Sequence, residues 1–246
     1  MLIHPTIDKM KDMKMFGMAR ALESQLELKE TRELSFEERL GMLLDAEALD
    51  RENRQTSTRL RNAKLRLTAC AEDLKFKPGR GLDRALITTL ASCDWIRDRR
   101  NVRITGATGA GKTYVACALG HSACRHGFTV AYYRAPSLFD DLLVAKADGR
   151  HKRILSSIES KKLLILDDFG LEKLTAESRR DLLEIMESRY GISSTIIASQ
   201  LPTEHWHDAI GDPTIADAIL DRTVHNAYDI KVKGPSMRKE NSDQNG

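Results

Sequence analysis

This 246-residue chain has few cysteines, few aromatic residues and no long apolar run. Its four cysteines form no C-x-x-C pair, and no histidine stands at zinc-ligand spacing from them, which argues against the common zinc motifs and favours reduced, buried thiols of a cytosolic protein. No apolar stretch approaches the length of a membrane span. The start, Met1–Pro5, breaks before a signal-peptide core can form. We therefore expect a cytoplasmic protein with no membrane partner.

An excess of charge of one sign is also missing. Lys and Arg number 39 against 36 Asp and Glu, and the net charge of +3 does not by itself indicate a nucleic-acid partner. Hydrophobic residues make up 41 % of the chain, which is enough for a packed core. The length suits one large domain, or one domain with a smaller attachment. Any case for nucleic acid therefore depends on local clusters of basic residues.

One stretch of eight residues matches the phosphate-binding pattern G-x-x-x-x-G-K-[ST]. Its residues are Gly106, Ala107, Thr108, Gly109, Ala110, Gly111, Lys112 and Thr113. The glycines let backbone N–H groups approach phosphate oxygens, Lys112 offers a positive charge to the β- and γ-phosphates, and Thr113 offers a hydroxyl to Mg²⁺. A strand candidate precedes the loop and a small, apolar helical stretch follows it. These flanks favour nucleotide binding with Mg²⁺ over a glycine-rich surface turn.

Strand and helix patterns alternate from residue 101 onward. The strand candidates are 101–105, 128–133, 163–167, 195–199 and 227–232. This alternation predicts an α/β fold with a parallel five-stranded sheet flanked by helices and a ligand site at the C-terminal edge of the sheet. We assign residues 101–240 to this nucleotide-binding domain, 71–100 to a linker and flanking helix, and 241–246 to a disordered tail.

Residues 1–70 have the pattern of a small all-helical domain. We assign DNA binding to it from its basic residues, and oligomerisation from the family resemblance described below. Ser35 and Glu38 fit a capping box, and the helical pattern that follows continues toward Leu67. Basic residues crowd its last part, with Glu52 as the only acid among them. They are Arg51, Arg54, Arg59, Arg61, Lys64 and Arg66. This excess favours DNA binding over a solvated helix face.

Two acids follow the apolar residues 163–166. Hydrolysis of a nucleotide needs a carboxylate for the metal and a group that polarises the attacking water. Asp167 fits the metal ligand and Asp168 fits the second role, which we favour over a helix cap or a loop. Ser199 and Gln200 end another apolar strand and could hydrogen-bond the γ-phosphate or the water, although polar strand ends are common.

Two arginines in the C-terminal part could supply the positive charge that assists phosphoryl transfer. Arg222 ends a helical stretch, and Arg238 follows a Gly-Pro turn. Phosphoryl transfer is often helped by an arginine from a neighbouring subunit. Either residue alone is more often an ordinary surface arginine.

Together these motifs resemble the IstB-like helper ATPases of insertion sequences, within the AAA+ initiator and helicase-loader group. The resemblance runs from 34–40 to 237–239. Its most specific blocks are 80–84, 91–95, 163–170, 199–207 and 208–214. It implies a P-loop AAA+ ATPase that uses ATP and Mg²⁺, forms a homo-oligomer on double-stranded DNA, and assists a cognate transposase in target DNA capture, with hydrolysis driving disassembly.

The resemblance also implies roles for individual residues. Arg222 would reach the γ-phosphate of a neighbouring subunit, Arg238 would contact nucleotide in its own subunit, and either Ser199 or Gln200 would be the sensor. Asp168 stands where a glutamate is commoner, and we expect the shorter acid to slow turnover.

The initiator group carries an extra helix that faces DNA, for which residues 135–160 have room. Basic residues cluster there, with Asp148 as the nearby acid. They are Lys146, Arg150, Lys152 and Arg153. From the residues alone, a solvated helix-turn is as good an interpretation; with the resemblance, DNA contact is favoured.

Two other functions stay open from the sequence. A replicative-helicase loader would share the same ATPase core, and the basic segment 51–66 fits DNA better than a protein partner without deciding between them. A non-hydrolysing architectural protein that coats DNA when bound to ATP belongs to another class. The paired acids Asp167 and Asp168 argue against it.

Overall fold

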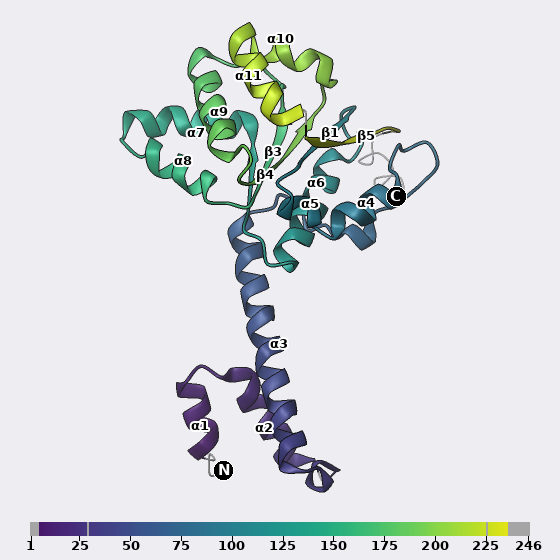
Figure 1. Ribbon diagram of the computed structural model, residues 1–246, viewed down its shortest axis with the longest axis vertical. Helices are drawn as coiled ribbons and strands as arrows, with labels where there is room; N and C mark the ends of the chain where they lie inside the picture. Colours follow the sequence, from purple (N-terminus) through teal and green to yellow (C-terminus); the bar gives the residue numbers. More distant parts are fainter. Residues whose placement is uncertain (1–4, 29, 225, 236–246) are drawn as a thin grey trace, which may run out of the picture. The chain divides into compact units, whose positions relative to one another are not determined.

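The structure is a computed structural model that describes residues 5–28, 30–224 and 226–235 (Figure 1). It divides into two compact units, Met1–Thr58 and Arg59–Gly246. The helical domain was predicted to extend to residue 70, whereas Leu60, Leu65 and Ala69 pack into the core of the second unit. The boundary between the two units falls inside one long helix, which begins at Phe36 and ends at Ala63.

The first unit is helical, as predicted. It contains α1 (Pro5–Asp12), α2 (Phe16–Glu27), the 3-10 helix η1 (Glu30–Glu33) and most of α3 (Phe36–Ala63). The capping box at the start of α3 is confirmed, because the N–H of Ser35 donates to Glu38 at 2.8 Å and the N–H of Glu38 donates to the Ser35 hydroxyl at 3.2 Å. Gly17 lets α2 approach α3 closely, since a Cβ there would lie 2.4 Å from the carbonyl oxygen of Ala46.

The predicted extension of this helix toward Leu67 is wrong. The helix α3 ends at Ala63, because Lys64 takes a left-handed backbone conformation with φ of 52°. A left-handed residue cannot continue a right-handed helix. Lys64 and Arg66 consequently lie beyond the helix, and the six basic residues do not share one helical surface.

The second unit is an α/β domain whose elements alternate along the chain. They are η2 (Ala71–Asp73), α4 (Arg84–Ala91), α5 (Asp94–Arg97), β1 (Asn101–Gly106), α6 (Lys112–Arg125), β2 (Val130–Arg134), α7 (Ala135–Ala147), α8 (His151–Glu159), β3 (Leu163–Phe169), α9 (Ala176–Arg189), β4 (Ser194–Ser199), η3 (Thr203–His205), α10 (Trp206–Ile210), α11 (Pro213–Val224) and β5 (Ala227–Val232).

The five strands form one parallel sheet in the order β2-β3-β4-β1-β5, which confirms the predicted fold class. Each predicted strand is present, with ends that differ from the prediction by at most a few residues. Because the strands are parallel, their carboxyl ends meet at one edge. We call this edge the C-terminal edge. The loop after β1, the acids of β3 and the polar end of β4 therefore converge there.

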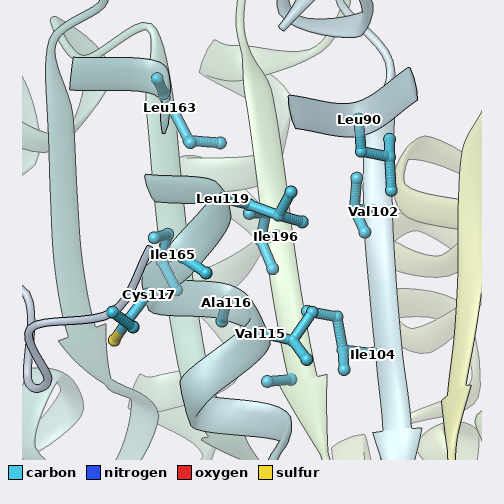
Figure 2. Packing of buried hydrophobic residues seen from close by; sticks show 14 of the residues in the cluster. Leu90, Val102, Ile104, Val115, Ala116, Cys117, Leu119, Leu163, Ile165 and Ile196 are labelled. Atoms are coloured by element: carbon cyan, nitrogen blue, oxygen red, sulfur yellow. The ribbon is translucent and has the colours of Figure 1, made fainter. Parts of the chain in front are cut away.

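Helices cover both faces of the sheet (Figure 1). On one face, α6 packs against the sheet through Val115, Ala116 and Leu119, which meet strand residues such as Ile104 and Ile196 (Figure 2). On the other face, α7 to α11 enclose a second core. Strand β3 lies between the two, and its residues 163–166 are fully buried, as expected of a central parallel strand. The phosphate loop is thus built on a rigid support.

No helix in the described part of the chain is long and apolar enough to cross a bilayer.

Candidate nucleotide site

The phosphate loop joins the end of β1 to the start of α6. Gly106 has φ of 155°, and a Cβ there would lie 2.1 Å from the carbonyl oxygen of Val232 on β5. Gly109 and Gly111 also have positive φ, at 78° and 107°. Only glycine adopts such angles readily, so the sequence pattern matches the backbone that the loop requires. The N-terminal end of α6 points into the loop, where an anion is favoured.

Lys112 lies inside the loop and is only 6 % exposed. Its Nζ donates to the carbonyl oxygens of Gly106 at 2.8 Å and Ala107 at 2.9 Å. Burial lowers the pKa of Lys112, and the charges of Asp167 and Asp168 oppose that shift. The ammonium is thus held by weak, neutral acceptors that an anionic phosphate can replace.

Asp167 is fully buried and is fixed by three donors. Its Oδ2 accepts hydrogen bonds from the Thr113 hydroxyl at 2.7 Å and the Tyr132 hydroxyl at 2.7 Å, and its Oδ1 accepts one from the N–H of Asp168 at 2.9 Å. Burial and the bond to Asp167 raise the pKa of Tyr132, so this tyrosine stays a donor. The structure therefore brings together the two residues predicted to bind the metal.

The donor set of this pair fits Mg²⁺, which prefers hard oxygen ligands and usually takes one or two carboxylates plus phosphates and water. Thr113 and Asp167 supply a hydroxyl and a carboxylate at the mouth of the phosphate loop. Within the described residues, no group of three or more His, Cys, Asp or Glu side chains could hold a metal ion.

Asp168 lies beside Asp167 in a strained position with φ of 58°. The pairing of β3 with β4 shifts register between Leu166 and Phe169, and such an irregularity re-aims side chains at a strand end. Asp168 Oδ2 accepts a hydrogen bond from Arg134 Nε at 2.8 Å and lies 3.6 Å from Arg66 Nη1. The acid predicted to polarise water is therefore held between two guanidinium groups.

The two candidate sensors behave differently. Ser199 is fully buried, and its hydroxyl donates to the carbonyl oxygen of Phe169 at 2.7 Å and accepts from the N–H of Leu201 at 3.0 Å. Gln200 instead reaches the phosphate loop, where its Oε1 accepts from the Thr108 hydroxyl at 2.6 Å. Ser199 ties β4 to β3, and Gln200 is the one that contacts the nucleotide-binding loop.

Arg222 lies at the opposite, N-terminal edge of the sheet. Its backbone carbonyl accepts a hydrogen bond from Asn101, the first residue of β1, at 3.1 Å. Its side chain donates to the carbonyl of Ala218 at 2.7 Å and to Glu187 at 3.0 Å, and it lines a surface cavity of about 310 Å³. A strand of this length spans about 20 Å, so Arg222 cannot reach a phosphate in its own loop. Arg238 lies outside the described residues.

Several predicted DNA-binding residues have acidic partners within their own unit. In the first unit, Arg51 bonds Glu47 at 2.6 Å and Arg54 bonds Asp50 at 2.7 Å. In the second, the predicted cations pair with acids as Lys146–Asp181, Arg150–Asp148 and Arg66–Asp168. Arg59 is half-buried. Four others are exposed and make no ion pair with any described residue: Arg61, Lys64, Lys152 and Arg153.

Three residues of this site were not found from the sequence: Tyr132, Arg134 and Arg80. Tyr132 and Arg134 alternate on β2, and the parallel register with β3 sets Arg134 opposite Asp167. Their polar side chains at the end of an apolar strand were the signal from which the sequence could have predicted both residues. Arg80 is buried and its Nη2 donates to the carbonyl oxygen of Ala110 in the loop at 2.9 Å. It begins the block 80–84, which carried no assigned role.

Comparison with known proteins agrees with this geometry. The family model described as "IstB-like ATP binding protein" matches residues 8–245. An insertion-sequence ATP-binding protein of Sinorhizobium fredii, y4pL, is 50 % identical over 239 residues, which cover 97 % of this chain and 98 % of that protein. The IS21 ATP-binding protein of Pseudomonas aeruginosa is 32 % identical over 226 residues, covering 92 % and 85 %.

Solved structures show the same fold. The DnaI crystal structure has a TM-score of 0.59 at 21 % identity, covering 74 % of this chain and 98 % of that chain. DnaA bound to AMPPCP and single-stranded DNA has a TM-score of 0.57 at 17 % identity, covering 74 % and 57 %. These two likenesses, at 21 % and 17 % identity, show the fold of the second unit: a parallel sheet flanked by helices. By its match over nearly its whole length, the chain belongs to the IstB-like ATP-binding proteins of insertion sequences.

Proposed function

We propose that this protein is an ATP-dependent, DNA-binding helper of transposition. It oligomerises on double-stranded DNA with ATP in the bacterial cytoplasm, assists a transposase in capturing target DNA, and leaves the DNA after hydrolysis. The observation that carries this proposal is the match to insertion-sequence ATP-binding proteins over 97 % of the chain, joined to a phosphate loop whose Thr113 bonds Asp167.

Hydrolysis is the first part of the proposal. Mg²⁺ held by Thr113 and Asp167 would neutralise charge on the β- and γ-phosphate oxygens. Lys112 exchanges its two carbonyl acceptors for phosphate oxygens, a stronger, charge-assisted interaction. Asp168 orients the attacking water once its carboxylate leaves Arg134, and Gln200 senses the γ-phosphate beside Thr108. Arg238 would contact nucleotide in its own subunit.

Oligomerisation is the second part. Arg222 and the phosphate loop lie at opposite edges of one sheet, so a site with both requires two copies of the chain. A head-to-tail arrangement places Arg222 of one copy at the loop of the next and leaves each end open to a further copy. An arginine supplied in this way stabilises the charge of the transferring phosphoryl group.

DNA binding is the third part. The best candidates for phosphate contacts are four exposed cations: Arg61 in the last turn of α3, Lys64 just beyond that helix, and Lys152 and Arg153 on α8. Arg51, Arg54, Arg59, Arg66, Lys146 and Arg150 could join them only by changing their present contacts. Arginine and lysine contacts to phosphates give weak sequence preference and strong salt dependence. If the logarithm of the DNA association constant did not fall with the logarithm of the salt concentration, this part of the proposal would be contradicted.

A helicase loader is the second candidate function, favoured by the likeness to the solved structure of the DnaC helicase loader over 99 % of that chain. That likeness at 19 % identity speaks for the fold, whereas the insertion-sequence relatives are 50 % and 32 % identical over most of their length. The deciding experiment is co-purification of the protein with its cognate transposase and, separately, with the host replicative helicase, in ATP. Capture of the transposase alone supports the proposal, and capture of the helicase alone overturns it.

Steady-state phosphate release with and without duplex DNA tests the enzymatic part. We expect release that depends on Mg²⁺ and is lost in Asp168→Asn. Parental rates in Asp168→Asn would remove the role assigned to that acid. No release from the parent under any condition would favour an architectural protein that only coats DNA.

A further inference from the structure

The turn Lys77–Gly81 lies between two parts of the nucleotide domain that are distant in sequence. The carbonyl oxygen of Arg80 accepts a hydrogen bond from the N–H of Lys233 at 2.8 Å, just after β5. Gly81 has φ of 67°, and a Cβ there would lie 2.3 Å from the carbonyl oxygen of Lys231. The turn is therefore pressed against the end of β5, and residues 231–234 fix its position.

The side chain of Arg80 extends from this turn to the phosphate loop. Its Nη2 donates to the carbonyl oxygen of Ala110 at 2.9 Å, and the residue is only 8 % exposed. A Cβ added at Gly234 would lie 3.8 Å from Arg80 Cγ, so the aliphatic part of the side chain passes along Gly234. One residue thus contacts the phosphate loop with its side chain and the segment after β5 with its backbone.

This contact has a direct consequence for the loop. In a planar trans peptide, the C=O of one residue and the N–H of the next point in opposite directions. Because Arg80 holds the Ala110 carbonyl on one side of the loop, the N–H of Gly111 is turned to the other. Backbone N–H groups of a phosphate loop are the donors that bind phosphate oxygens. A hydrogen bond from a charged guanidinium also holds a carbonyl more firmly than a neutral donor does.

We propose that Arg80 is a positioning residue of the nucleotide site, which fixes the peptide between Ala110 and Gly111 in its phosphate-binding orientation. The turn Lys77–Gly81 then belongs to the site rather than to a linker. The proposal rests on nucleotide binding by this loop and needs neither hydrolysis nor DNA.

The test compares Arg80→Met with Arg84→Met, by calorimetric titration of ADP with Mg²⁺. Arg84 is a matched control from the same segment, since it is exposed and stacks on Phe76 at 4.6 Å rather than contacting the loop. Losing a charge-assisted hydrogen bond should weaken ADP binding by roughly tenfold or more in Arg80→Met. Arg84→Met should stay within about twofold, a surface effect. Parental affinity in Arg80→Met would overturn the proposal.

Hydrogen exchange separates positioning from general destabilisation. Arg80→Met should speed exchange in the peptide that covers 106–113 while β1 and β4 keep parental protection. Equal acceleration in all three segments would assign Arg80 a merely structural role and overturn the proposal. Arg80→Lys, which keeps a charged donor, should recover part of the ADP affinity lost in Arg80→Met.

If Arg80→Met does not fold, two glycine variants test whether the turn Lys77–Gly81 supports the nucleotide site. Gly79 and Gly81 both have left-handed backbones, with φ of 84° and 67°, so alanine strains them alike. Only at Gly81 would the new Cβ collide with β5, since nothing lies within 4 Å of it at Gly79. Gly81→Ala should therefore weaken ADP binding more than Gly79→Ala, and equal effects would contradict the proposal. Failure of the parent to bind ADP would instead remove the nucleotide site itself.

Discussion

At the C-terminal edge of the sheet, Lys112 and Asp167 are buried and held by several short hydrogen bonds, whereas at the N-terminal edge Arg222 pairs with a half-exposed Glu187 on the protein surface. The first edge has the chemistry to bind a nucleotide. The second has one candidate group for phosphoryl transfer and no phosphate loop beside it. Under the proposed function, a single chain would carry two halves of a catalytic site that could meet only between two copies.

The largest loss of nucleotide binding is expected from Lys112→Ala, which disables the C-terminal edge alone. Its ammonium has no substitute in the loop, so ATP affinity should fall by about a hundredfold or more, in line with loss of a buried charge-assisted contact. Calorimetric titration of ATP measures this. Arg222 should be unaffected, so a Lys112→Ala copy still offers its N-terminal edge to a neighbour. ATP affinity close to the parent would contradict the assignment of the loop.

Arg222→Ala should disable the other edge and leave binding intact. An arginine finger is typically worth about 10³-fold or more in the rate of phosphoryl transfer. We expect a loss of that order in phosphate release, with ATP affinity within about twofold of the parent since the loop is about 20 Å away. Arg180→Ala, an exposed arginine on α9, is the control. Equal losses of affinity and rate would show that Arg222 acts on the fold instead.

Arg134→Met should raise phosphate release in the absence of DNA, because it removes the guanidinium that occupies Asp168 Oδ2. The increase should be several-fold, since Arg66 stays 3.6 Å from the same oxygen. The double variant Arg66→Met with Arg134→Met should rise further. A fall in the rate of both variants would mean that the two arginines assist hydrolysis rather than hold the acid back.

Tyr132→Phe should have the smallest effect, because it deletes one oxygen and leaves Thr113 bonded to Asp167. Without this hydrogen bond, the Asp167 carboxylate is less well oriented toward the metal. The variant should therefore need a several-fold higher Mg²⁺ concentration for half-maximal phosphate release. Mn²⁺ binding followed by electron paramagnetic resonance gives a readout independent of turnover. Tyr133→Phe on the same strand is the matched control. An unchanged metal requirement would limit Tyr132 to packing.

Local pattern predicted most of the C-terminal edge. The phosphate loop, the strand ending in Asp167 and the five parallel strands each leave a signature within a dozen residues. Tyr132 and Arg134 were missed because they meet the acids across 35 and 34 residues, through a β2–β3 register that pattern alone does not give. The end of α3 was misplaced because Lys64, an ordinary helix former, takes a left-handed backbone inside the second unit, which begins at Arg59.

At the N-terminal edge, too, the role of a residue depends on contacts that local sequence does not give. Sequence and resemblance named Arg222 as a finger, and the fold shows only that it lies far from its own loop. Its role depends on a second chain.

Mixing two inactive variants tests most directly whether the two edges form one site between copies. Lys112→Ala lacks a working loop and keeps Arg222, while Arg222→Ala keeps the loop and lacks the finger. We predict that an equimolar mixture, assembled on duplex DNA with ATP and Mg²⁺, releases phosphate well above the sum of the separate variants. Shared assemblies, verified by cross-linking, that release no more than that sum would contradict the account.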